Sequence, residues 1–281
     1  MNAPVATETV KVYFIQPLES ISVVMSVLIK LNFEVYSVPL DDAYRLVPIL
    51  KAHPRNVVYF CVSSDTDAAQ WLAYIDMLAS YTPTQIQFGI FISATIAKAA
   101  TLAFLNHGVA TIDLARLQSN TLETLRKILL YFEAREKRKF VRARAFGICQ
   151  VLFKLKNLQD AVKTDLEEIS IRAFSVKVQS DDKVFFNSGQ YIQDVTILLR
   201  GKRLRLSARF MGFDRQSPDK GIFLIYFPNI ESGKVEYHQQ LPKEVRHAIY
   251  DYIQVALRED IKRQLEKMEE ERPAAETLEL I

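Results

Sequence analysis

Two arginines separated by three residues, Arg138 and Arg142, are the side chains best suited to ligand chemistry in this sequence. They lie in "REKRKFVRAR" (residues 135–144), where six of ten side chains are cationic, including Lys139 and Arg144 beside the pair. Guanidinium groups bind phosphate oxygens bidentately. The segment is therefore open to three interpretations: a solvated helix end that complements the helix dipole, a nucleic-acid surface, or an arginine clamp for one phosphate ligand.

The positive charge is concentrated in the middle third of the chain. The 281 residues carry a net charge of +3, but residues 135–220 hold 19 Lys and Arg against 10 Asp and Glu, a net charge of +9. Residues 1–134 sum to −2 and residues 221–281 to −4. Like charges crowded together cost stability, so this basic excess indicates an anionic ligand or partner.

Catalytic chemistry finds no comparable support. The sequence has no glycine-rich phosphate loop, and its histidines share no motif with a nucleophile or a metal-ligand set; they are His53, His107, His238 and His247. Cys61 and Cys149 lie in apolar segments without metal or redox spacing. We therefore expect no enzyme, no metal site and no cofactor, with both thiols reduced and buried.

No apolar run approaches the roughly 20 residues of a membrane helix, and the N-terminus lacks the pattern of a secretory signal. We therefore expect a cytoplasmic protein without a membrane span.

In the first half of the sequence, apolar runs typical of buried strands alternate with segments of helical periodicity. Strands are predicted at 10–17, 34–39, 56–63, 86–93 and 109–115, and helices at 20–33, 41–54, 67–81, 95–108 and 120–138. Five such units predict a doubly wound α/β domain with a parallel sheet in the flavodoxin-like order.

From residue 145 the hydrophobic pattern changes. Apolar residues now alternate with polar ones, as in half-buried strands, and turn residues separate these stretches. These strands predict a small antiparallel barrel or sandwich, and residues 242–272 predict a closing helix. Its distal apolar residues Ile261, Leu265 and Met268 suggest a short self-association seam. The predicted domains are 1–133 (α/β), 134–144 (basic linker), 145–265 (β-barrel with helix) and 266–281 (polar tail).

The first half resembles a response-regulator receiver domain, through the element pattern of residues 10–132 and stretches such as "IQFGIFISA" and "NHGVATIDLA". The resemblance implies an acceptor Asp after the third strand, an acid pair after the first, and a Lys ending the fifth. The corresponding positions hold Gln16, Pro17, Val62, Ser63, Ser64 and Arg116, while Ser93 occupies the place of the switch hydroxyl. We therefore expect a degenerate receiver without phosphoryl transfer, with Asp65 as the alternative acceptor.

The second half resembles the PilZ family of cyclic di-GMP receptors. The family pattern is a linker Arg-x-x-x-Arg followed by Asp/Asn-x-Ser-x-x-Gly on the barrel. Arg138 and Arg142 match the first part, and "EISIRA" follows, with Glu168 for the acid, Ser170 for the serine and Ala173 for the glycine. The resemblance implies a PilZ-like barrel of residues 135–260 that binds cyclic di-GMP. Arginines would pair with phosphate and guanine, and Glu168 and Ser170 would hydrogen bond to the ligand.

Three hypotheses follow from these patterns. The first is a cytoplasmic cyclic di-GMP effector, in which Arg138, Lys139, Arg142 and Arg144 hold the ligand against Glu168, Ser170 and Ala173, and binding changes the domain arrangement and partner surface. The second is a PilZ-scaffold interaction module that no longer binds nucleotide. Nonspecific nucleic-acid binding ranks below both. The family resemblance suggests motility or virulence control through an unknown protein partner, and a helix face or the tail helix offers a surface for a homodimer.

Overall fold

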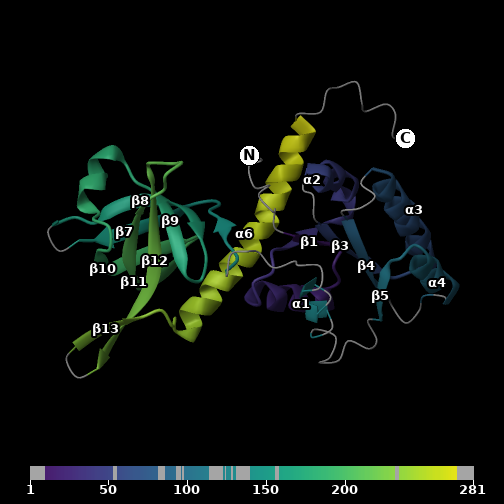
Figure 1. Cartoon of the computed structure of the whole chain (residues 1–281), viewed down its shortest axis with the longest axis horizontal. Helices are drawn as coiled ribbons and strands as arrows, with labels where there is room; N and C mark the ends of the chain where they lie inside the picture. Colours follow the sequence, from purple (N-terminus) through teal and green to yellow (C-terminus); the bar gives the residue numbers. More distant parts are fainter. Residues whose placement is uncertain are drawn as a thin grey trace, which may run out of the picture. The chain divides into compact units, whose positions relative to one another are not determined.

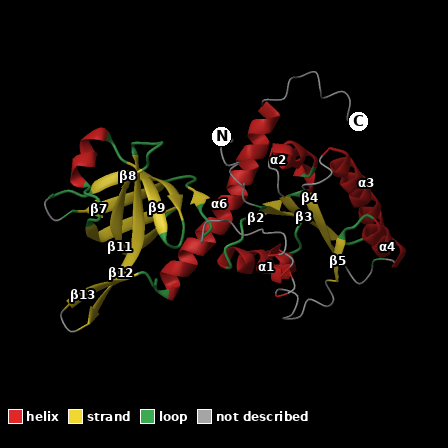
Figure 2. Ribbon diagram, viewed as in Figure 1, coloured by secondary structure: helices red, strands yellow, loops and turns green. Residues whose placement is uncertain are grey.

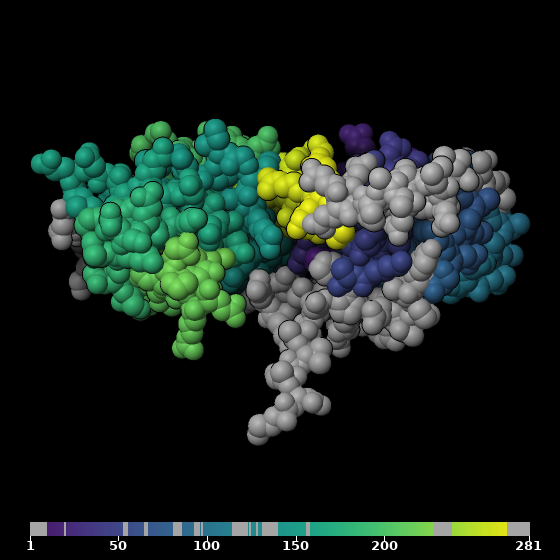
Figure 3. Space-filling view, turned by 90° about the horizontal axis from the view of Figure 1, so that it is seen from above, coloured from purple at the N-terminus to yellow at the C-terminus, as the bar shows by residue number. Residues whose placement is uncertain are grey.

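The structure is a computed structural model that describes residues 10–52, 56–81, 86–92, 96, 98–113, 123, 125–127, 129–130, 140–155, 158–231 and 234–270. The other residues are grey in Figures 1 and 3. The chain divides into two compact units. One is Phe140–Leu257, and the other joins Met1–Lys139 with Arg258–Ile281.

The first unit contains the predicted parallel sheet with helices. Its strands are β1 (Lys11–Ile15), β2 (Val35–Val38), β3 (Asn56–Val62), β4 (Ile86–Ile92) and β5 (Ala110–Asp113). They pair in the order β2-β1-β3-β4-β5, all parallel, which confirms the flavodoxin-like order. The described helices are α1 (Glu19–Lys30), α2 (Val47–Ala52), α3 (Asp65–Tyr81) and α4 (Lys98–Asn106) (Figure 1).

The centre of this sheet is buried on both faces. Every residue of β3 is buried, as a parallel strand covered on each side requires. Gly89 of β4 lies opposite Tyr59 of β3, and a Cβ at Gly89 would lie 2.3 Å from the Tyr59 ring. Glycine is therefore required there so that the ring can cross the neighbouring strand.

The helix predicted over 41–54 is shorter than expected. Residues Leu40–Asp42 and Tyr44–Leu46 form two 3₁₀ turns, η1 and η2, before α2 begins at Val47. Val47 precedes Pro48 and is itself helical, so the proline does not block the start of α2. Pro48 lies in the first turn of α2, where its missing N–H removes no bond within the helix.

The second unit is a closed antiparallel barrel, as the sequence predicts (Figure 2). Strands pair in the order β11-β10-β7-β8-β9-β12, and β12 pairs back to β11. The bounds are β7 (Cys149–Lys154), β8 (Val162–Ile169), β9 (Ala173–Lys177), β10 (Tyr191–Leu199), β11 (Lys202–Phe213) and β12 (Lys220–Glu231). The sequence patterns did not predict three further elements: β6 (Ala143–Arg144), the 3₁₀ helix η4 (Ser180–Phe185) and β13 (Lys234–His238).

Phenylalanine rings fill the barrel interior. Phe153, Phe174, Phe210 and Phe223 are each nearly fully buried, and the Phe174 and Phe223 rings stack at 5.2 Å between centroids. Outside this core, positive φ angles at Arg200 and Gly201 form the two-residue turn that joins β10 to β11.

The chain continues into one long helix, α6 (Lys243–Glu270). Its first half buries Ile249 and Ile253 in the barrel unit. In its second half Ile261 and Leu265 are each only 2% exposed in the single chain. The predicted self-association seam is therefore wrong for these two side chains, because the chain's own residues already cover them.

No helix in the described ranges combines the length and the apolar character needed to cross a bilayer.

Candidate ligand-binding site

The basic segment ends on the barrel itself. Immediately after Arg142, residues Ala143 and Arg144 form β6, which pairs antiparallel with the end of β8. Arg144 lies opposite Glu168, and the Ala145 N–H donates to the Glu167 carbonyl at 2.7 Å. This pairing places Arg142 next to the Glu-x-Ser stretch on one edge of the barrel.

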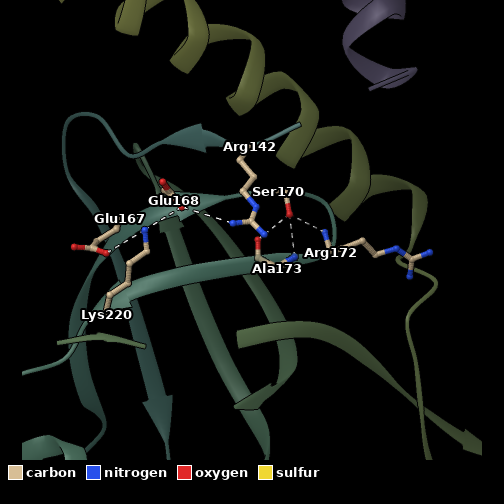
Figure 4. Close-up of polar contacts among 7 residues, drawn as sticks. All are labelled: Arg142, Glu167, Glu168, Ser170, Arg172, Ala173 and Lys220. Carbon is tan, nitrogen blue, oxygen red and sulfur yellow. Dashed lines mark hydrogen bonds and ion pairs between the residues drawn. The ribbon is translucent and has the colours of Figure 1, made fainter. Parts of the chain in front are cut away.

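Glu168 is the centre of a small charge cluster (Figure 4). Lys220 Nζ lies 3.1 Å from Glu168 Oε2 and 3.8 Å from Glu167 Oε2, while Arg142 Nη1 lies 4.0 Å from the same Glu168 oxygen. The strand register shifts between Leu166 and Glu168, a bulge that lets neighbouring glutamates reach one lysine. The Arg142 side chain remains 43% exposed, so its guanidinium is free to turn toward an anion from solvent.

Ser170 closes the turn between β8 and β9. Its hydroxyl donates to the Ala173 carbonyl at 3.0 Å and accepts from the Ala173 N–H at 3.0 Å and the Arg172 N–H at 3.3 Å. A hydroxyl offers one donor and two acceptor lone pairs, so these bonds use its whole capacity. Ser170 is also only 2% exposed. In this conformation it shapes the turn and has no hydrogen bond left for a ligand.

Ala173 adopts an ordinary backbone conformation. Among the described residues other than glycine, only Gln16, Asn32 and Arg200 have positive φ. The Cβ of Ala173 therefore carries none of the left-handed strain that a required glycine would imply. Alanine at this position, where the PilZ pattern has glycine, is therefore compatible with the turn.

Arg172 also belongs to the candidate site, although it is not one of the fixed positions of the PilZ pattern. Its Nη1 donates to the Gln239 carbonyl at 2.6 Å, and its guanidinium lies 5.3 Å from the centre of the Phe140 ring. Figure 4 shows its side chain pointing away from the Ser170 turn. The only signal in the sequence was its place as the fifth residue of "EISIRA".

The structure brings together Arg142, Arg144 and Glu168, with Ser170 and Ala173 in the adjoining turn. Arg138 and Lys139 lie outside the described residues. Lys220 was missed because it belongs to another strand, and only the pairing of β8, β9 and β12 brings it beside Glu168.

The β10–β11 hairpin carries a further group of basic residues, whose arginines are of two kinds. Arg203 and Arg205 are exposed on β11, opposite Leu198 and Thr196. Arg200 and Arg209 instead cover aromatic rings, at 4.7 Å from the centre of Phe146 and 5.3 Å from that of Tyr191.

The edge of the α/β sheet where a receiver would be phosphorylated carries a helix cap. Asp67 Oδ2 accepts from the Ser63 hydroxyl at 2.6 Å and from the Ser64 N–H at 3.1 Å, while the Asp67 N–H donates to the Ser64 hydroxyl at 3.1 Å. The Ser63 hydrogen bond is the main cause that lowers the pKa of Asp67 below its usual value. Reciprocal bonds of this kind are a capping box at the start of α3.

Several receiver positions fall outside the description: Ser93, Arg116 and the side chain of Asp65. Within the described part of the chain, no group of three His, Cys, Asp or Glu side chains is arranged to hold a metal ion.

No protein-family model matches the chain, and no curated protein matches it in sequence. Solved structures similar to it include the Bacillus subtilis inhibitor of motility MotI/DgrA (19% identity, TM-score 0.31, 47% of this chain and 53% of that chain). Another is the K. pneumonia MrkH–c-di-GMP complex (11% identity, TM-score 0.32, 46% of this chain and 56% of that chain). A third is the PilZ domain of Escherichia coli YcgR with c-di-GMP (10% identity, TM-score 0.34, 47% of this chain and 99% of that chain).

The matched region spans about half the length of the MotI/DgrA and MrkH chains. Because every TM-score quoted is below 0.5, the functional proposals rest on this chain's own residues.

Proposed function

We propose that the chain is a non-catalytic cyclic di-GMP receptor whose ligand lies against the edge of the barrel formed by β6, β8 and the β8–β9 turn. One observation carries the proposal: β6 pairs with β8, so that Arg142 of the linker motif lies beside Glu168 of the barrel motif. This position of Arg142 supports a ligand held jointly by the linker motif and the barrel motif.

The charges around this edge suit a ligand with two phosphates and two guanines. Arg142, Arg144, Arg172 and Lys220 are cationic, and the guanidinium groups among them offer bidentate hydrogen bonds to phosphate or to guanine O6 and N7. Glu168 supplies an acceptor for the guanine N1 and N2 donors. Ser170 positions the turn, so its contribution to binding is indirect.

Ligand binding at Arg142 would also act on the segment that leads into the barrel. In this proposal the phosphate draws Arg138 and Arg142 onto the barrel and reduces the freedom of the chain between the two units. The bound state then presents a different surface to a protein partner. Small-angle scattering with and without ligand would detect the change as a shift in radius of gyration.

Calorimetric titration of the full chain with cyclic di-GMP tests the proposal. Saturable heat is expected. GMP should compete only weakly, because two separate nucleotides lack the high effective concentration that the covalent link gives to the second half of the ligand. Absence of heat at high micromolar ligand would contradict the proposal.

The same geometry favours a second candidate, a PilZ-scaffold interaction module without nucleotide. Glu168 is already paired with Lys220, and the hydrogen bonds of the Ser170 hydroxyl are used within the turn. This candidate predicts no heat with cyclic di-GMP, together with protein capture that does not change when Arg142 is replaced.

A further inference from the structure

Four outward residues form a row across the barrel, starting at the candidate site. Ala173 of β9 lies opposite Leu224 of β12, Leu224 opposite Arg209 of β11, and Arg209 opposite Tyr191 of β10. Adjacent strands are 4.7–4.9 Å apart, so about 10 Å separates the backbones at Ala173 and Arg209. The row therefore extends the surface of the β8–β9 turn over three neighbouring strands.

Burial shows that this row faces outward. The residues next to it along the four strands are nearly fully buried in the core: Phe174, Phe223, Phe210 and Ile192. Because side chains alternate across a strand, the row residues point away from that core. Tyr191 is 41% exposed, and Ala173, Leu224 and Arg209 are partly exposed.

Arg209 holds unused hydrogen-bonding capacity in this row. Its guanidinium lies over the Tyr191 ring, and its buried Nε has no acceptor. Within the described residues, the guanidinium makes no hydrogen bond or ion pair. The Nη groups, unlike Nε, are not among the buried atoms without a partner, so a ligand acceptor can reach them.

The surroundings of Arg209 hold its aromatic partner in place. Tyr191 contacts the edge of Tyr226 at 5.4 Å between ring centres, and the Tyr226 hydroxyl accepts from Gln239 Nε2 at 3.1 Å. Gln239 in turn binds Arg172 of the β8–β9 turn. A chain of contacts thus connects the candidate site to the Tyr191–Arg209 pair.

From this arrangement we infer that the row Ala173–Leu224–Arg209–Tyr191 binds one guanine base of the ligand. This inference rests on the proposed function and adds the residues that select the base. Ala173 and Leu224 form an apolar floor, and Tyr191 offers a ring on which the base stacks. The Arg209 fork donates to guanine O6 and N7. Adenine carries an amino donor where guanine has O6, so Arg209 discriminates against it.

Titrations with cyclic di-GMP and cyclic di-AMP test this inference in the full-length protein. Arg209→Lys keeps the charge but loses the fork, and is expected to weaken cyclic di-GMP binding about tenfold or more while changing cyclic di-AMP binding little. Tyr191→Leu removes stacking, which every base makes, and is expected to weaken both ligands alike. Arg203→Lys, at an exposed position of the same strand, is the matched control.

The outcomes separate the two claims. If the wild type binds cyclic di-GMP but Arg209→Lys leaves both affinity and base preference unchanged, the row is not the base site and the proposed function stands. If the wild type binds neither ligand, both claims are wrong. Thermal unfolding of each variant establishes that it is folded, and Tyr191→Leu gives a second test that does not depend on Arg209.

Discussion

The Ser170 hydroxyl oxygen lies 3.0 Å from both the amide nitrogen and the carbonyl oxygen of Ala173. These two hydrogen bonds hold the β8–β9 turn closed. The serine of the motif thus determines the backbone shape on which the other site residues depend. Its role is to position the turn.

Replacement of this serine should therefore reduce stability as well as binding. Ser170→Ala leaves the N–H groups of Arg172 and Ala173 without their acceptor, and we expect the free energy of unfolding to fall by about 1–3 kcal/mol. Urea unfolding measures the loss. Ser180→Ala, at an exposed position of η4, is the matched control and should change little. Equal stability of the two variants would contradict the assigned role.

Glycine at position 173, as in the PilZ pattern, should not stabilise this protein. Because Ala173 has no positive φ, Ala173→Gly relieves no strain and adds freedom to the unfolded chain. We expect a loss of about 0.5–1 kcal/mol in the free energy of unfolding, measured by urea titration. A gain in stability would show that the turn is strained after all.

A tyrosine hydroxyl of α6 adds a polar contact to the apolar packing of this helix on the barrel. Tyr252 accepts from the buried Phe146 N–H at 3.1 Å and its hydroxyl lies 3.2 Å from Cys149 Sγ. Tyr252→Phe removes the acceptor, and we expect about 1–3 kcal/mol less stability in urea unfolding. Tyr44→Phe, at a ring that is largely exposed, should be neutral. Similar losses in both variants would contradict this account.

Cys61 should make stability fall at alkaline pH. Burial raises the pKa of its thiol from 9.0 to about 11, partly offset by a backbone hydrogen bond with Leu18. The folded state therefore keeps the proton longer than the unfolded state. The resulting stability is present below pH 9 and is lost as the pH rises toward 11.

The measurement for Cys61 is the difference in unfolding free energy between wild type and Cys61→Ala from pH 8 to 11. The difference should shrink with rising pH, because alanine does not titrate. A constant difference across that range would rule out the raised pKa.

Sequence patterns predicted the elements well where burial alternates or runs continuously. On β11, Leu204 and Leu206 are buried while Arg203 and Arg205 are exposed, which is the alternation read from the sequence. The strand β3, apolar in every residue after Asn56, was equally clear. The helix predicted over 41–54 begins late, because residues 40–46 form two 3₁₀ turns before α2.

The candidate site was harder to predict because its contacts are tertiary. Arg142 and Glu168 were found through the motif, but Lys220 joins them only by strand pairing across β9. The internal hydrogen bonds of Ser170 depend on turn geometry that residue types alone do not specify. Tyr191 and Arg209 carry no motif, and only the register between their strands makes them a pair.

Calorimetric titration of Arg142→Ala with cyclic di-GMP, beside the wild type and the Arg138→Ala/Arg142→Ala double variant, tests the central claim most directly. The account predicts saturable binding by the wild type, a loss of about tenfold or more in Arg142→Ala, since a bidentate charged contact is removed, and a further loss in the double variant. Wild-type affinity in Arg142→Ala, or no binding by the wild-type chain, would contradict it.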